Sequence, residues 1–169
     1  SEDPVYSKLA QRVMNRYMQE EVSSQNISNF FESVQRGCEL GLISEEKAEF
    51  VFENKEALNL IIDKTRNDKF EYFGFRTVYD RYLLKHPETR QNIETPQYFF
   101  LRVACGLAKT FPEAKEFYDL ISQMDYMPSS PTLFNSATLR PQLSSCYLLD
   151  SPEDDLNSIY DKYKDIALL

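Results

Sequence analysis

The chain has 169 residues, of which 42% are hydrophobic, enough for one core and part of another. Its 27 acidic and 19 basic residues give a net charge of -8, which disfavours a surface built to neutralise nucleic-acid phosphates. No apolar run approaches the roughly 20 residues that cross a bilayer, and residues 1–10 lack a signal-peptide pattern. We therefore expect a globular, cytoplasmic protein whose partners include neither a nucleic-acid polymer nor a membrane.

The cysteine, histidine and glycine content excludes several kinds of site. Cys38, Cys105 and Cys146 have no C-x-x-C spacing, so neither a disulfide framework nor a zinc site is predicted. With His86 as the only histidine, a histidine-based metal site or a hydrolytic triad within the chain is not expected. The four glycines form no phosphate-binding glycine loop. Any thiol chemistry must therefore use one cysteine with a partner outside the chain.

The N-terminal third of the chain carries helical patterns. Asp3 as an N-cap followed by Pro4 favours a helix over residues 4–21. A second helix, residues 29–39, is predicted to stop at Gly41. The inner faces are expected at recurring apolar positions, which are Val5, Leu9, Val13 and Tyr17 in the first helix and Phe30, Val34 and Cys38 in the second.

The middle of the chain is less regular. Two more helices are predicted between Ser44 and Arg66. The aromatic residues 70–76 are predicted to form a short extended element followed by a helical turn. The polar stretch 86–94 is interpreted as a boundary.

Beyond that boundary the pattern returns to helices and then changes. Thr95 and Pro96 predict the start of a helix over residues 97–109 that is buried on most sides. Pro112 begins another, with an inner stripe of Phe117, Leu120, Ile121 and Met124. After Tyr126, prolines and serines predict two short strands, near Leu133 and at 146–149, and then a helix over 158–169. The chain begins without methionine and ends inside that helix, so we expect a fragment, a split protein or a truncated chain.

Residues 127–149, MPSSPTLFNSATLRPQLSSCYLL, resemble the first barrel strands of ribonucleotide reductase large subunits, through S-P-T-L-F-N and R-P-Q-L-S-S-C. Residues 93–108, IETPQYFFLRVACGLA, and 154–169, DDLNSIYDKYKDIALL, are similar to the same family in the same order. The resemblance implies a mainly α chain with a helical N-terminal domain, residues 1–92. It also implies that residues 93–169 are the incomplete start of the catalytic α/β barrel domain, with the first strands and a helix.

The resemblance implies a class I ribonucleoside-diphosphate reductase, which makes deoxyribonucleotides for DNA replication by radical chemistry. Replacing a ribose 2′-hydroxyl by hydrogen requires a radical and a thiol pair that supplies two electrons. By resemblance Cys146 is one redox-active member of that pair and becomes disulfide-bonded after turnover. Its partner cysteine, the thiyl-radical cysteine and the catalytic glutamate and asparagine lie outside this sequence. We therefore expect the chain to be inactive alone and to carry no cofactor, the radical coming from a metal-containing small subunit.

The resemblance also assigns binding residues. Ser130 and Ser145, beside Cys146, match positions that contact the substrate's phosphates. The effector site at the dimer interface is matched by Asp154, Asp155 and Leu156. Alternatives remain open for these positions, because Ser130 also suits a turn cap and the two aspartates also suit a helix N-terminus.

The implied partners are the radical-generating small subunit, a second large subunit in a homodimer, ribonucleoside diphosphate substrates, nucleoside triphosphate effectors, and thioredoxin or glutaredoxin as reductant. No segment resembles the ATP-binding regulatory cone of many large subunits. A class II reductase that uses adenosylcobalamin, a non-catalytic assembly half of a split reductase, and a helical adaptor with a partner-binding arm remain alternatives. Because isolated strands lack neighbours, residues 127–169 are expected to be poorly ordered or aggregation-prone by themselves.

Overall fold

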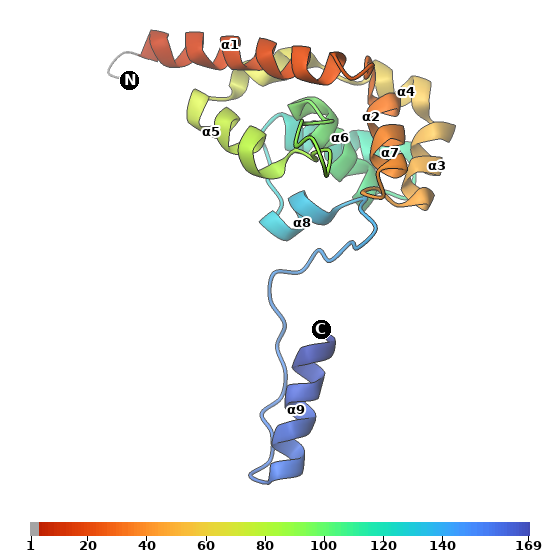
Figure 1. Ribbon diagram of the computed structural model, residues 1–169, viewed down its shortest axis with the longest axis vertical. Coiled ribbons are helices and arrows are strands. Elements are labelled where there is room, and N and C mark those ends of the chain that lie inside the picture. Colours follow the sequence, from red (N-terminus) through yellow and green to blue (C-terminus); the bar gives the residue numbers. More distant parts are fainter. Residues whose placement is uncertain (1–3) are drawn as a thin grey trace.

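A computed structural model describes residues 4–169 as a helical body from which the C-terminal segment extends (Figure 1). The N-terminal helices are α1 (Pro4–Ser23), α2 (Phe30–Glu39), α3 (Glu45–Glu53) and α4 (Lys55–Leu60). The 3₁₀ helix η1 (Lys64–Lys69), α5 (Tyr72–Thr77) and the π-helix η2 (Val78–Tyr82) follow. The remaining helices are α6 (Pro96–Leu107), α7 (Phe111–Ser122), α8 (Ser130–Asn135) and α9 (Leu156–Leu168).

Helix α6 forms the centre of the body. Its residues from Pro96 to Cys105 are all buried, which confirms the predicted helix that is enclosed on most sides. It packs against α7 and also against α2, α3 and η1. The ring of Phe100 stacks on Phe70 at 5.9 Å, so α6 also reaches the aromatic segment before it. Helices from both sides of the predicted boundary at residue 92 therefore share one core.

Side-chain caps fix several helix starts that the sequence predicted. Asn29 accepts from the backbone N–H of Glu32, and Ser44 accepts from that of Lys47. Thr95 caps α6 in the same way, and α7 begins with a capping box formed by Thr110 and Glu113. These bonds satisfy N–H groups that have no partner in the first helical turn, so the starts follow from local sequence.

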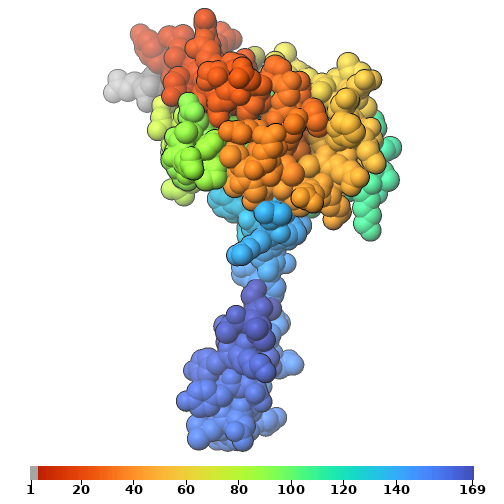
Figure 2. Space-filling model, turned by 45° about the vertical axis from the view of Figure 1, so that its right-hand side comes forward, coloured from red at the N-terminus to blue at the C-terminus, as the bar shows by residue number. Residues whose placement is uncertain are grey.

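Helix α1 is formed as predicted, but its inner face was assigned wrongly. Met14, Met18 and Val22 are buried, while the predicted stripe of Val5, Leu9, Val13 and Tyr17 is 57–69% exposed. Both sides of α1 carry apolar residues, so periodicity could not choose between them. Gln11 lies on the same side as Met14, and its side-chain N–H donates to the Asn67 backbone carbonyl at 2.8 Å, a contact between this side of α1 and η1. Figure 2 shows α1 along the outside of the body.

Three predicted elements differ from the structure. Residues 70–76 are mostly helix α5, continued by η2, because Phe75 turns into the core and meets Phe70 edge-on at 5.3 Å. The helix predicted to end near Arg66 stops at Leu60, and η1 follows. In α7, Leu120 is 40% exposed and Tyr118 is buried in its place, whereas Ile121 is buried as predicted.

The predicted strands are absent from the described residues. The strand near Leu133 is helix α8 instead, started by Pro131 in its first turn. Residues 146–149 are extended but unpaired, because no neighbouring strand within residues 4–169 receives their backbone hydrogen bonds. Across the same range the β pairing consists of two isolated bridges, Ile43 with Thr138 and Lys85 with Asn92. The mainly α part of the predicted fold is observed, and the barrel part is not formed here.

The chain leaves the body after Leu139 and runs as an extended segment to α9 (Figures 1 and 2). No residue of α9 is buried, and Tyr160 and Tyr163 are 66% and 62% exposed. The predicted C-terminal helix is confirmed, with its start two residues earlier than expected. Among the described residues, none of the helices has the length and apolarity needed to span a bilayer.

Candidate functional site

The predicted substrate residues lie where the helical body passes into the extended segment. Ser130 is the first residue of α8, and its Oγ lies 3.0 Å from the Tyr82 hydroxyl. Ser145 and Cys146 lie in the chain that follows α8, and both are exposed. Two hydrogen bonds connect α8 to this later segment. The Asn135 side-chain N–H donates to the Gln142 carbonyl at 2.7 Å, and the Thr132 hydroxyl donates to the Leu143 carbonyl at 3.2 Å.

An open hollow of about 880 Å³ lies beside these bonds. Ser144 and Ser145 contribute hydroxyl groups, and Arg140 is the one cationic side chain among the described residues of its lining. Hydroxyls and a guanidinium suit a phosphate group. Sequence reasoning left Arg140 and Ser144 unassigned, although both lie within the R-P-Q-L-S-S-C motif. The lining consists of Gly41, Leu42, Leu84, Pro131, Phe134, Asn135, Thr138, Leu139, Arg140, Gln142, Ser144 and Ser145.

The three cysteines occupy different environments, and all are free thiols. Cys105 is buried in α6, and this burial raises its pKa to about 12, so it stays protonated at neutral pH. Cys38 is half-buried on α2, whereas Cys146 is exposed and directly follows Ser145 at the hollow. Accessible thiols are the ones that take part in exchange chemistry. Of the three, Cys146 is therefore the thiol that an external group can reach.

The predicted effector residues lie at the start of α9. Asp155 is its N-cap, and the carboxylate accepts from the backbone N–H groups of Asn157 and Ser158 at 2.9 and 3.2 Å. Leu156 begins the helix and is 73% exposed, and Asp154 is also exposed. The structure therefore gives Asp155 a capping function, and it leaves Asp154 and Leu156 on the surface. The structure does not bring these residues to the hollow with Ser145.

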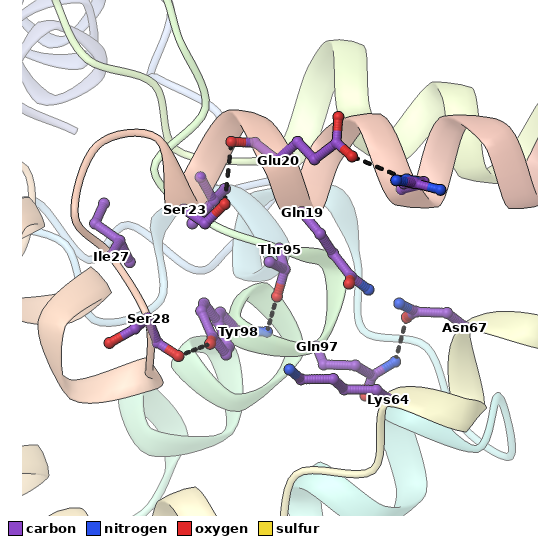
Figure 3. A pocket seen from close by; sticks show the side chains of 12 residues that line it. Gln19, Glu20, Ser23, Ile27, Ser28, Lys64, Asn67, Thr95, Gln97 and Tyr98 are labelled. Carbon is purple, nitrogen blue, oxygen red and sulfur yellow. Dashed lines mark hydrogen bonds and ion pairs between the residues drawn. The ribbon is translucent and has the colours of Figure 1, made fainter.

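A second, polar pocket of about 430 Å³ lies between α1, η1 and α6 (Figure 3). Its floor is a connected amide network, in which Gln97 donates to the Asn67 side-chain oxygen at 2.7 Å and accepts from the Tyr118 hydroxyl at 2.7 Å. These buried polar groups satisfy one another, as an interior network should. The pocket contains none of the predicted site residues, so we assign it no catalytic function.

Possible metal ligands do not gather in the described part of the chain. Between residues 4 and 169, no group of three or more histidine, cysteine, aspartate or glutamate side chains is placed to hold a metal ion. Several acidic side chains of the body make ion pairs, as Asp119 does with Arg66 at 2.8 Å.

Comparison with known proteins gives the family. Residues 68–141 match the model of the ribonucleotide reductase all-alpha domain. The chain is 39% identical to the ribonucleoside-diphosphate reductase large chain of Cryptosporidium parvum over 92% of its own length and 20% of that relative. It is 36% identical to the large subunit of Arabidopsis thaliana over 98% of its length and 21% of the relative. For the Danio rerio large subunit, the identity is 41% over 76% of the chain and 16% of the relative.

The matched all-alpha domain, residues 68–141, lies almost entirely within the helical body and includes α5, η2, α6, α7 and α8. The chain belongs to the family of ribonucleotide reductase large subunits, and it spans about a fifth of the length of the relatives it matches.

Proposed function

We propose that this chain is part of a ribonucleoside-diphosphate reductase and that it supplies one thiol of the redox-active cysteine pair, Cys146. The observation that carries the proposal is an exposed thiol immediately after Ser145, a residue that lines a hollow together with Ser144 and Arg140. The relatives named ribonucleoside-diphosphate reductase support the part of the proposal that concerns the enzyme family.

The proposed reaction balances with two thiols. The ribose C2′–O bond breaks and a C2′–H bond forms, and the hydroxyl leaves as water. The two electrons come from Cys146 and a second cysteine elsewhere in the longer protein, which end as a disulfide. Radical chemistry supplied by a metal-containing small subunit activates the ribose, and this chain contributes no cofactor to that step. An external dithiol, such as thioredoxin or glutaredoxin, then restores the pair.

The remaining residues have binding functions in this proposal. Ser130 and Ser145 contact the phosphates of a ribonucleoside diphosphate through hydroxyl and backbone N–H donors. A nucleoside triphosphate effector binds at the start of α9, against Asp154, Asp155 and Leu156. We propose that this helix lies at the interface between two large subunits, which would cover the apolar side chains it exposes. The proposed setting is the cytoplasm, where thiols are kept reduced.

The test is to map thiols by mass spectrometry in the full-length enzyme with its small subunit. One turnover is run with a ribonucleoside diphosphate and no external reductant. Cys146 should become disulfide-linked after turnover, and buried Cys105 should stay a free thiol as the internal control. A Cys146→Ser variant should fail at repeated turnover. A free Cys146 thiol in enzyme that has made deoxynucleotide would refute the assignment, and activity that needs adenosylcobalamin instead of a small subunit would favour the class II alternative.

A further inference from the structure

A buried ion pair lies behind the α8 segment. The side chains of Arg102, on α6, and Glu94, just before it, are 1% and 2% exposed. Arg102 Nε donates to Glu94 Oε1 at 2.5 Å, and its Nη2 donates to Oε2 at 3.3 Å. Removing two charges from water is costly, and an apolar pair of similar volume is often at least as stabilising. The pair is therefore better explained by the geometry it imposes than by stability.

The third donor of Arg102 reaches the end of α8. Its Nη1 donates to the backbone carbonyl of Ser136, the C-cap of α8, at 2.8 Å. The Ser136 hydroxyl in turn donates to the Val103 carbonyl on α6 at 3.0 Å. At Gly106, one turn along α6, a Cβ atom would overlap the Ser136 side chain and the Ala137 backbone nitrogen. The backbone at 136–137 thus lies directly against α6.

The residues that follow Ser136 are fixed as well. Ala137 has a left-handed backbone conformation, with φ of 66°, and its carbonyl accepts from the Ser44 backbone N–H at 3.1 Å. Thr138 then pairs with Ile43 in an isolated bridge. The chain therefore turns at one defined point before it enters the segment 139–145.

Both proposed phosphate contacts depend on the position of the turn at Ser136 and Ala137. Ser130 lies at the start of α8, whose end is Ser136, and Ser145 lies at the end of the segment that starts just after it. The bonds from Asn135 to Gln142 and from Thr132 to Leu143 join the two parts. Movement of Ser136 would therefore change how the two serines are placed relative to each other.

We propose that Arg102 is a positioning residue for substrate binding. Together with Glu94 and Ser136 it forms a buried clamp that holds α8 and the segment 139–145 in one arrangement, so that Ser130 and Ser145 bind the same nucleotide. The inference rests on the proposed function. The planar guanidinium suits this function because it directs three separate donors at two partners, which the single ammonium of a lysine does not.

The experiment uses the full-length enzyme with its small subunit. Arg102→Met combined with Glu94→Gln removes the ion pair without leaving a buried charge, and the amide oxygen of the substituted side chain still offers an acceptor to the Leu84 N–H. We expect the KM for the ribonucleoside diphosphate to rise about tenfold, while kcat falls less than about threefold, because binding geometry and not the chemical step is affected.

Arg66→Met is the matched control. Arg66 is a mostly buried arginine that donates to Asp119 at 2.8 Å and to Ser122 at 2.6 Å. Both partners lie on α7, so neither bond involves α8. The Arg66→Met variant should lower the melting temperature but leave KM within about twofold of the parent. The proposal would be overturned if the Arg102→Met, Glu94→Gln enzyme and the Arg66→Met enzyme had equal KM values while both were destabilised. Arg102 would then have a structural function only.

A milder variant covers the case in which the double variant does not fold. Thr132→Val keeps the side-chain shape but removes the bond to the Leu143 carbonyl. KM should rise about threefold at an unchanged melting temperature, with faster amide hydrogen exchange across residues 139–143. An unchanged KM would count against the proposal. A parent enzyme that makes no deoxynucleotide would instead refute the proposed function, so the two failures are distinguishable.

Discussion

Helices α6 and α9 have similar lengths but opposite environments. Residues 96–105 of α6 are all buried, whereas no residue of α9 is buried. Both helices begin with a side-chain cap, Thr95 in one and Asp155 in the other. Local sequence is therefore enough to start each helix, but burial requires neighbours from elsewhere in the chain. The molecule separates a stable helical body from an exposed segment, residues 139–169, which carries Ser145, Cys146 and the proposed effector residues.

Limited proteolysis of the 169-residue chain tests this separation most directly. Chymotrypsin should cut after Tyr147 and Leu148, which are 46% and 99% exposed in extended backbone. Cleavage at Phe99 or Phe100 requires unfolding of the body, so it should be at least about a thousandfold slower. Phe73 is 82% exposed but helical, and it is the control that separates exposure from backbone conformation. Mass spectrometry of the fragments gives the order of cleavage. Early cuts within α6 would contradict the division between the helical body and the exposed segment 139–169.

The next effect concerns the core itself. Phe100→Ala removes a ring that is fully buried and stacked on Phe70. We expect a loss of about 3–5 kcal/mol in the free energy of unfolding, since removal of the ring leaves a large cavity in the core around α6. Tyr163→Ala in α9, at 62% exposure, should change it by less than about 0.5 kcal/mol. Urea denaturation checks both, and similar losses would show that α9 contributes to the same core.

A pair of glycine substitutions tests how closely α8 approaches α6. Gly106→Ala places a Cβ against Ser136 and Ala137, and overpacking of this kind should cost about 1–3 kcal/mol. Gly74→Ala in α5 meets only the Phe70 ring at 3.6 Å, an ordinary contact, so it should stabilise the helix by about 0.5–1 kcal/mol. The same change in two helices should therefore have opposite signs in thermal melts. A neutral Gly106→Ala would mean that 136–137 does not lie on α6 in solution.

Burial of Cys105 gives the stability of the body a weak pH dependence. Burial raises the pKa of Cys105 from 9.0 to about 12, so above pH 9 the unfolded chain loses a proton that the folded chain keeps. This contribution to stability is complete below pH 9 and is lost as pH rises toward 12. Cys105→Ala should reduce the slope of the unfolding free energy against pH between about pH 9 and 10.5, as measured by urea denaturation at several pH values. Identical slopes in the parent and Cys105→Ala would contradict the burial of this thiol.

Much of the helical body could be predicted from local patterns, because caps and turns involve near neighbours in the chain. Asn29, Ser44 and Thr95 start their helices as expected, and Gly41 takes the left-handed conformation, with φ of 69°, after α2. The candidate site was found through the motif around Cys146. The positioning role of Arg102 could not be inferred in this way, because its partner Ser136 is 34 residues away along the chain.

The family, most helix starts and the buried character of α6 follow from the amino-acid order alone, since they depend on motif, capping chemistry and a nearly continuous apolar run. Tertiary contacts were needed to establish which side of α1 faces the core, that residues 70–82 are largely helical, and that α8 replaces a predicted strand. A distant contact accompanies each of these features: Gln11 with Asn67, Phe70 with Phe100, and Arg102 with Ser136. Local periodicity carries no information about such partners, and burial is decided by them.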